Sequence, residues 1–146
     1  MFFYKRSVFF PNYLFYNDGS IFSLFKRKFI HKNILENGYC LYHLTDYQNK
    51  RISIYAHRLI YFVFNYNISF NIINNSPDTL KIINSFISKN YVIDHKNEIR
   101  SDNSIENLQL LSVRDNIIKS KQNNNPIYKQ LDKKHYNKFK KTKKIE

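Results

Sequence analysis

Three side chains in the second half of the chain have types that can bind a metal ion or accept a proton. Asp94 and His95 are adjacent, and Asn116 follows further along the sequence. A carboxylate and an amide carbonyl are hard oxygen ligands suited to Mg²⁺ or Mn²⁺, which usually keep several waters and take further ligands from phosphates. A neighbouring imidazole, with an ordinary pKa of about 6.5, can accept a proton from water at neutral pH. These residues suggest a one-metal site beside a general base.

Two short strands and a loop are expected to position the first pair. A β-rich run at 91–93 ends at Asp94 and His95, a polar segment covers 96–106, and a second apolar run follows at 108–111. Such runs, separated by a polar segment, predict two strands joined by a loop. Asp94 and His95 then lie where the first strand ends.

A helix should follow the second strand. Ser112 and Asp115 have the spacing of a capping box, which begins a helix and puts Asn116 in its first turn. The Asn and Pro residues at 123–126 act against its continuation. We therefore expect a ββα unit over residues 91–123, with the helix start facing Asp94 and His95.

The first third of the chain has the pattern of a small antiparallel sheet. Runs 13–16 and 21–24 flank Asn-Asp-Gly-Ser at 17–20, and Asp-Gly is a strong hairpin signal. Two more β-rich runs, 39–44 and 51–56, enclose a polar loop. They extend the predicted sheet.

The middle of the chain changes to helical signals. A dense apolar stretch at 57–64 favours a short buried helix, in which we interpret His57 as a buried or capping residue rather than a catalyst. The Ser-Pro-Asp sequence at 76–78 and the apolar spacing that follows predict an amphipathic helix over 77–89.

The charge balance points to a polyanionic partner. The formal net charge is +13, and residues 117–146 carry ten lysines against Asp132 and Glu146. AT-rich coding is an alternative source of the lysines, but it does not explain their concentration at one end. The composition is compatible with a phage, an organellar intron or a large AT-rich DNA virus. The terminal tail could either bind DNA or remain a solvated segment.

Cysteine content and hydropathy exclude several other classes. Cys40 is the single cysteine, so neither an internal disulfide nor a Cys-rich zinc site can form. No apolar run approaches the roughly 20 residues of a membrane span, and the first ten residues lack signal-peptide features. We expect a soluble protein that is not secreted and works in a reducing compartment, without a membrane partner.

The order of these motifs resembles a known family. Val-Ile-Asp-His at 92–95, Ser-Asp-Asn at 101–103, Ile-Glu-Asn-Leu at 105–108 and Ser-Val-Arg-Asp-Asn at 112–116 resemble the HNH endonuclease motif of homing endonucleases. Segments 13–23, 37–39 and 56–60 resemble the module that precedes this motif in phage and intron-encoded nucleases. The resemblance covers about residues 11–123.

The resemblance implies roles for individual residues. His95 would be the general base, Asp94 and Asn116 the ligands of Mg²⁺ or Mn²⁺, and Asn107 a brace that hydrogen-bonds across the loop. Asn103 is either a second structural residue of the site or an ordinary turn former. The substrate would be double-stranded DNA, and no small-molecule cofactor is expected.

The chain departs from the family pattern in two places. Asn97 and Glu98 stand where relatives often have Asp-Gly, so the loop must turn without glycine. The stretch between residues 64 and 91 is also longer than in the family pattern, which indicates an insertion.

The expected fold is α+β: a small antiparallel N-terminal sheet followed by a ββα-metal, or His-Me finger, motif. We expect a hairpin and sheet module with a short helix at 11–64, an insertion with an amphipathic helix at 65–90, the nuclease motif at 91–123 and a lysine-rich tail at 124–146. A monomer is expected.

The predicted function is metal-dependent cleavage of DNA by a homing or mobile-element nuclease. The alternative is a DNA-binding protein that keeps the HNH scaffold without cutting. In either case basic side chains should contact phosphates, although such residues can also form a plain solvated surface. The candidates are Lys26, Arg27, Lys28, Lys96, Arg100, Arg114, Lys119 and Lys121.

Overall fold

The first four strands form one antiparallel sheet in sequential order. The structure, a computed structural model, describes residues 1–68 and 78–123. The sheet contains β1 (Tyr4–Lys5), β2 (Tyr13–Tyr16), β3 (Ile21–Ser23) and β4 (Lys28–Phe29). The predicted hairpin is confirmed, because β2 pairs with β3 around the turn that contains Gly19. This glycine has a φ of 87°, a conformation that side chains disfavour.

A second, three-stranded sheet follows instead of an extension of the first. It consists of β5 (Asn33–Ile34), β6 (Cys40–Thr45) and β7 (Arg51–Tyr55), all antiparallel. Alternate residues of β6 and β7 are buried, as expected for strands that cover a core with one face. The single N-terminal sheet expected from sequence is thus two sheets, because β4 and β5 are not paired with each other.

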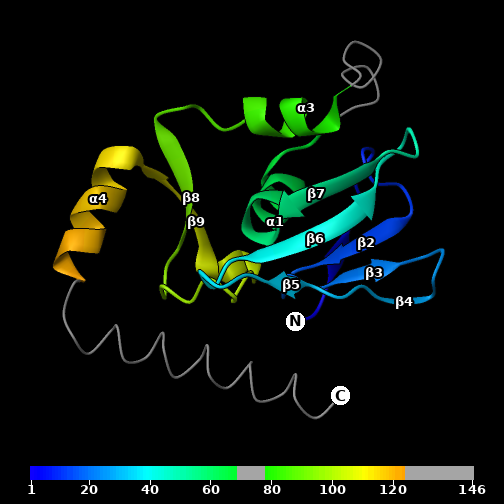
Figure 1. Cartoon of the computed structure of the whole chain (residues 1–146), viewed down its shortest axis with the longest axis horizontal. Helices are drawn as coiled ribbons and strands as arrows, with labels where there is room; N and C mark the ends of the chain where they lie inside the picture. The colour runs from blue at the N-terminus through cyan, green and yellow to red at the C-terminus, as the bar shows by residue number, and fades with distance from the viewer. Residues whose placement is uncertain (69–77, 124–146) are drawn as a thin grey trace.

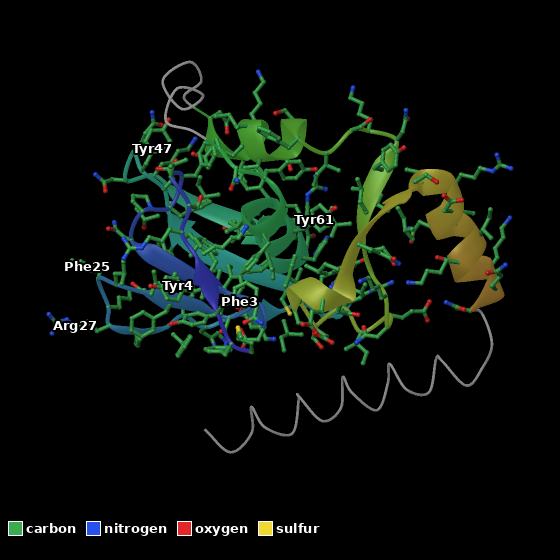
Figure 2. All side chains as sticks on the ribbon, turned by 180° about the vertical axis from the view of Figure 1, so that it is seen from behind. Phe3, Tyr4, Phe25, Arg27, Tyr47 and Tyr61 are labelled. Carbon is green, nitrogen blue, oxygen red and sulfur yellow. The ribbon has the colours of Figure 1, made fainter. Side chains whose placement is uncertain are left out.

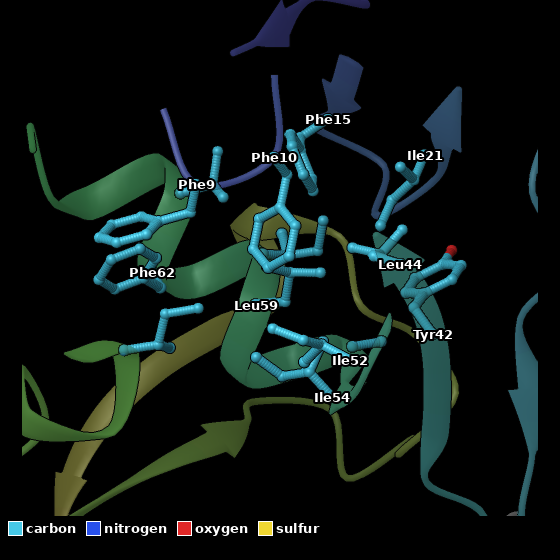
Figure 3. Close-up of a cluster of buried hydrophobic side chains, with 14 of the residues drawn as sticks. Phe9, Phe10, Phe15, Ile21, Tyr42, Leu44, Ile52, Ile54, Leu59 and Phe62 are labelled. Atoms are coloured by element: carbon cyan, nitrogen blue, oxygen red, sulfur yellow. The ribbon is translucent and has the colours of Figure 1, made fainter. Parts of the chain in front are cut away.

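The helix α1 (Ala56–Asn65) is central to the molecule (Figure 1). It begins directly after β7 and contacts β6, β7, β8 and β9. Leu59 and Phe62 on this helix join a core that includes Phe9, Phe10 and Leu44 (Figure 3). The predicted buried helix is confirmed, and its packing connects the N-terminal sheets to the C-terminal strands.

The next helix, α3 (Thr79–Ser85), is shorter than the predicted span of 77–89. Its cap is Asp78, whose side chain accepts a hydrogen bond from the Lys81 amide. Ser76 and Pro77, the expected start signals, lie outside the described residues. Thr79 is buried and donates its hydroxyl to Asp46 at 2.9 Å, which holds the helix start on the β6–β7 loop.

The C-terminal part is the predicted ββα unit. Strands β8 (Tyr91–His95) and β9 (Leu108–Ser112) are antiparallel, and a 3-10 turn, η1 (Ile105–Asn107), precedes β9. Helix α4 (Val113–Gln122) begins at the Ser112 cap, whose hydroxyl accepts the Asp115 amide at 3.0 Å. Figure 1 shows α4 and β4 at opposite ends of the molecule.

Within the described residues, no helix combines the length and apolarity needed to cross a membrane.

Candidate active site

The end of β8 presents Asp94 and His95 on opposite faces of the strand. In the β8–β9 ladder, Asp94 pairs with Gln109 and His95 with Leu108. Successive strand residues point to opposite sides, so Asp94 faces α4 while His95 enters the interior, where it is 4% exposed. Although the two residues are adjacent in the sequence, their side chains contact different elements. Asp94 contacts α4, and His95 contacts the loop between β8 and β9.

The hydrogen bonds around His95 define its protonation. Its Nε2 lies 3.0 Å from Oδ1 of Asn103, and the Asn103 amide nitrogen donates to the Ser101 carbonyl at 3.3 Å. The amide oxygen therefore faces the ring, so Nε2 carries the proton and Nδ1 keeps the lone pair. Burial lowers the pKa of His95 below its usual value. The imidazole is thus neutral at neutral pH, with Nδ1 available as a base.

Aromatic rings surround this histidine. The His57 and His95 ring centroids are 5.3 Å apart, and the Tyr39 ring lies 6.0 Å from His95. Arg100 lies over the Tyr39 ring at 4.8 Å and donates to the Asn37 carbonyl. Burial lowers the pKa of His57 to about 3, and its buried Nδ1 has no hydrogen-bond partner among the described residues. The expected buried histidine is confirmed, as a packing residue beside the candidate base.

Asn107 spans the loop that carries the site. Its Oδ1 accepts the Asn97 amide at 3.0 Å, and its Nδ2 donates to the Asp102 carbonyl at 2.8 Å. The loop turns at Glu98, which has a φ of 64° and donates its amide to the His95 carbonyl. A non-glycine residue thus takes the left-handed conformation in this turn. The hydrogen bonds fit the brace expected of Asn107.

The N-terminal hairpin supports the same loop. A Cβ placed on Gly19 would lie 2.5 Å from the Asn103 carbonyl oxygen, so only a glycine fits against Asn103. The Tyr42 hydroxyl donates to the Gly19 carbonyl, and the Ile105 amide donates to the Asn17 carbonyl. The sequence did not predict this contact between Gly19 and Asn103, because the hairpin turn alone was a sufficient reason for a glycine at that position.

Asp94 and Asn116 are the predicted metal ligands, one at the end of β8 and the other in the first turn of α4. Asp94 Oδ2 accepts Lys119 Nζ at 2.7 Å and Gln109 Nε2 at 2.8 Å. Asn116 lies one turn before Lys119 on α4, on the same helix face, and its side-chain amide has no hydrogen bond to another described residue. No cluster of three His, Cys, Asp or Glu side chains occurs in the described ranges. One carboxylate and one amide oxygen still fit a magnesium ion that keeps several waters.

The predicted DNA-binding residues are spread along the molecule. Lys26, Arg27 and Lys28 are exposed around the β3–β4 turn, and Figure 2 shows Phe25 and Arg27 at the end away from α4. Arg114 and Lys121 are exposed on α4. Three others have partners: Lys96 donates to the Glu106 carbonyl, Arg100 to Asn37, and Lys119 to Asp94 and the His95 carbonyl. The structure therefore does not gather them in one patch.

Comparison with known proteins agrees with the resemblance seen in the sequence. Residues 87–117 match the HNH endonuclease family model. The fold is similar to a solved structure described as DNA binding and cleavage by the HNH homing endonuclease I-HmuI, with a TM-score of 0.58, 19% identity, and coverage of 94% of this chain and 68% of that one. No curated protein sequence matches the chain. The HNH resemblance and the α+β fold with its ββα unit are confirmed.

Proposed function

With the HNH match over residues 87–117 as the premise, we infer that this chain is a metal-dependent endonuclease that hydrolyses DNA phosphodiester bonds. The observation that carries the proposal is the arrangement of His95. It is buried, neutral and held through Nε2 by Asn103, and Asp94 precedes it on the same strand. A homing or mobile-element role agrees with the structural neighbour's description.

In this mechanism, His95 Nδ1 takes a proton from a water whose oxygen bonds to phosphorus. The bond to the 3′ oxygen breaks, and that oxygen leaves with the electron pair and takes a proton from water. The Nε2–H bond to Asn103 holds the ring orientation during this transfer. Burial is the largest effect and lowers the pKa of His95. The charges of Asp94 and Asp102 act in the opposite direction, because they favour the protonated imidazole. The resulting imidazolium is stabilised by those carboxylates.

Asp94 and Asn116 would hold the divalent ion, Mg²⁺ or Mn²⁺. When bound, that ion would neutralise charge on the phosphate and the leaving oxygen. The exposed cations Lys26, Arg27 and Lys28 would contact the duplex backbone, and such contacts weaken as salt concentration rises.

The test is nicking of supercoiled plasmid by the full chain. We expect cleavage with Mg²⁺ or Mn²⁺, none with excess EDTA, and a loss of about 100-fold or more in His95→Ala. His31→Ala is the matched control, because His31 is exposed and lies outside the site. Full activity in EDTA, or an unimpaired His95→Ala variant, would contradict the mechanism. A single-stranded RNA substrate cleaved faster than DNA would contradict the assignment of the substrate.

One observation favours a second candidate, a DNA-binding protein that does not cut. The ammonium of Lys119 pairs with Asp94, the only carboxylate of the proposed ligand pair. Salt-sensitive gel shifts without nicking, at any concentration of Mg²⁺ or Mn²⁺, would support this candidate over the nuclease.

A further inference from the structure

The Lys119 ammonium lies among the same kinds of oxygen that a hard divalent ion takes. It is 2.7 Å from Asp94 Oδ2 and 2.8 Å from the His95 carbonyl oxygen. The Lys119 side chain is 21% exposed and that of Asp94 is 14% exposed, so the pair is largely shielded from water. Carboxylate and carbonyl oxygens are ligands typical of Mg²⁺ sites.

Lys119 and Asn116 are neighbours on α4, and Lys119 contacts Asp94 of β8. Residues three apart on a helix share a face, and Lys119 reaches Asp94 from that face. Gln109, the cross-strand neighbour of Asp94, donates to the same Oδ2 atom. The Asp94 carboxylate is therefore held in one orientation by two donors, and Asn116 lies on the α4 face that carries Lys119.

The Lys119 ammonium and a divalent ion bound at the Asp94 carboxylate would repel each other. Like charges a few ångströms apart repel strongly where water is partly excluded. The Lys119 side chain has a flexible four-carbon stem and partial access to solvent, so it can move outward.

We propose that Lys119 competes with a divalent ion for Asp94: its ammonium pairs with Oδ2 and is displaced when the ion binds. The proposal rests on the proposed function, because it takes Asp94 and Asn116 as metal ligands. It adds that Lys119 competes with the ion and sets the affinity of the site below what Asp94 and Asn116 alone would give.

Metal affinity without DNA is the direct test. Mn²⁺ is titrated into the full chain, and free Mn²⁺ is measured by electron paramagnetic resonance. Lys119→Met keeps the stem but removes the charge, and we expect it to bind Mn²⁺ about tenfold more tightly, which corresponds to about 1.4 kcal/mol. Lys121→Met removes the same charge from an exposed position on the same helix, and should bind like the wild type.

A second measurement needs no variant. Amine labelling at fixed pH, followed by mass spectrometry of peptides, should show Lys119 protected in EDTA and labelled severalfold faster in Mg²⁺. Lys121 should label equally in both. If Lys119→Met fails to fold, this measurement decides the proposal by itself.

Several results would overturn the proposal. Equal Mn²⁺ affinity in wild type and folded Lys119→Met, or Lys119 labelling that Mg²⁺ does not change, would remove Lys119 as a competitor. If metal-dependent nicking persists in those cases, the proposed nuclease function stands. If neither protein binds Mn²⁺ and no nicking occurs, the metal site and the displacement both fail.

Discussion

His95 donates its Nε2 proton to the Asn103 amide oxygen over 3.0 Å, and this bond leaves Nδ1 as the basic atom of the ring. The two residues are separated along the chain but both are almost completely buried. The sequence left Asn103 open between a structural residue of the site and an ordinary turn former, and its bond to Nε2 fits the structural role.

Removing Asn103 should impair cleavage more than folding. Asn103→Ala leaves the ring free to change tautomer, so we expect plasmid nicking to fall by up to about 100-fold, within the range of base catalysis. Circular dichroism checks folding. Asn90→Ala is the control, since the exposed Asn90 side chain has no hydrogen bond in the described part of the chain. A wild-type rate in Asn103→Ala would rule out the tautomer role.

Alanine substitutions at Gly19 and Gly38 can be compared to test the contact between the first hairpin and Asn103. Both have a φ of 87°, but a Cβ on Gly19 would lie 2.5 Å from the Asn103 carbonyl oxygen, whereas one on Gly38 would meet Arg100 at 3.6 Å. Alanine at either position costs about 1–2 kcal/mol for the left-handed backbone. Gly19→Ala should lose about 1–3 kcal/mol more through overpacking.

Urea denaturation would measure both losses, and nicking assays should show that Gly19→Ala is also less active because the clash displaces Asn103. Gly38→Ala should cut DNA at nearly the wild-type rate. Equal destabilisation of the two variants would mean that the contact between the hairpin and the loop adds nothing.

The Asn107 side chain should contribute to stability. Asn107→Ala loses hydrogen bonds to the Asn97 amide and the Asp102 carbonyl in a residue that is 8% exposed. Leaving buried groups unpaired costs about 1–3 kcal/mol each, so the free energy of unfolding should fall by at least that amount. Asn12→Ala, at an exposed position, should change it by about 0.5 kcal/mol or less. A similarly small decrease in the free energy of unfolding for Asn107→Ala would show that the Asn107 side chain does not stabilise the loop.

His57 should make the fold sensitive to acid. Burial lowers the pKa of His57 to about 3, while the unfolded chain has a value of about 6.5. Between these values only the unfolded state binds the proton, so stability rises with pH and is lost as pH falls from about 6.5 towards 3. The neighbours His95 and Arg58 add to the effect of burial.

A comparison with His57→Phe isolates this contribution, because phenylalanine keeps a ring against Tyr39 and His95. Between pH 7.5 and pH 5, the unfolding free energy of the wild type should fall on the order of 1–2 kcal/mol more than that of the variant. His31→Phe serves as the surface control. Parallel stability curves for the wild type and His57→Phe would show that His57 is not the acid-sensitive group.

Local patterns in the sequence were sufficient for the elements that carry the site. The β-rich run before Asp94, the capping pair Ser112 and Asp115, and the Asp-Gly turn each act through neighbouring residues, so they predicted β8, α4 and the first hairpin. The helix α3 was placed less well, since its cap is Asp78 and its first turn depends on the distant Asp46.

Only the tertiary structure decided how the side chains of the site pair with one another. The hydrogen bond of Asn103 to His95 and the ion pair of Lys119 with Asp94 depend on packing between separate segments of the chain. The hydrophobic periodicity of the sequence does not predict such packing. The same holds for Gly19 against Asn103 and for the ring of His57 beside His95. The amino-acid types near the strand end determined which chemistry is available, because ligand and base properties belong to single residues. The protonation and orientation of His95 and the ion pair of Asp94 arise from burial and from partners far apart in the chain.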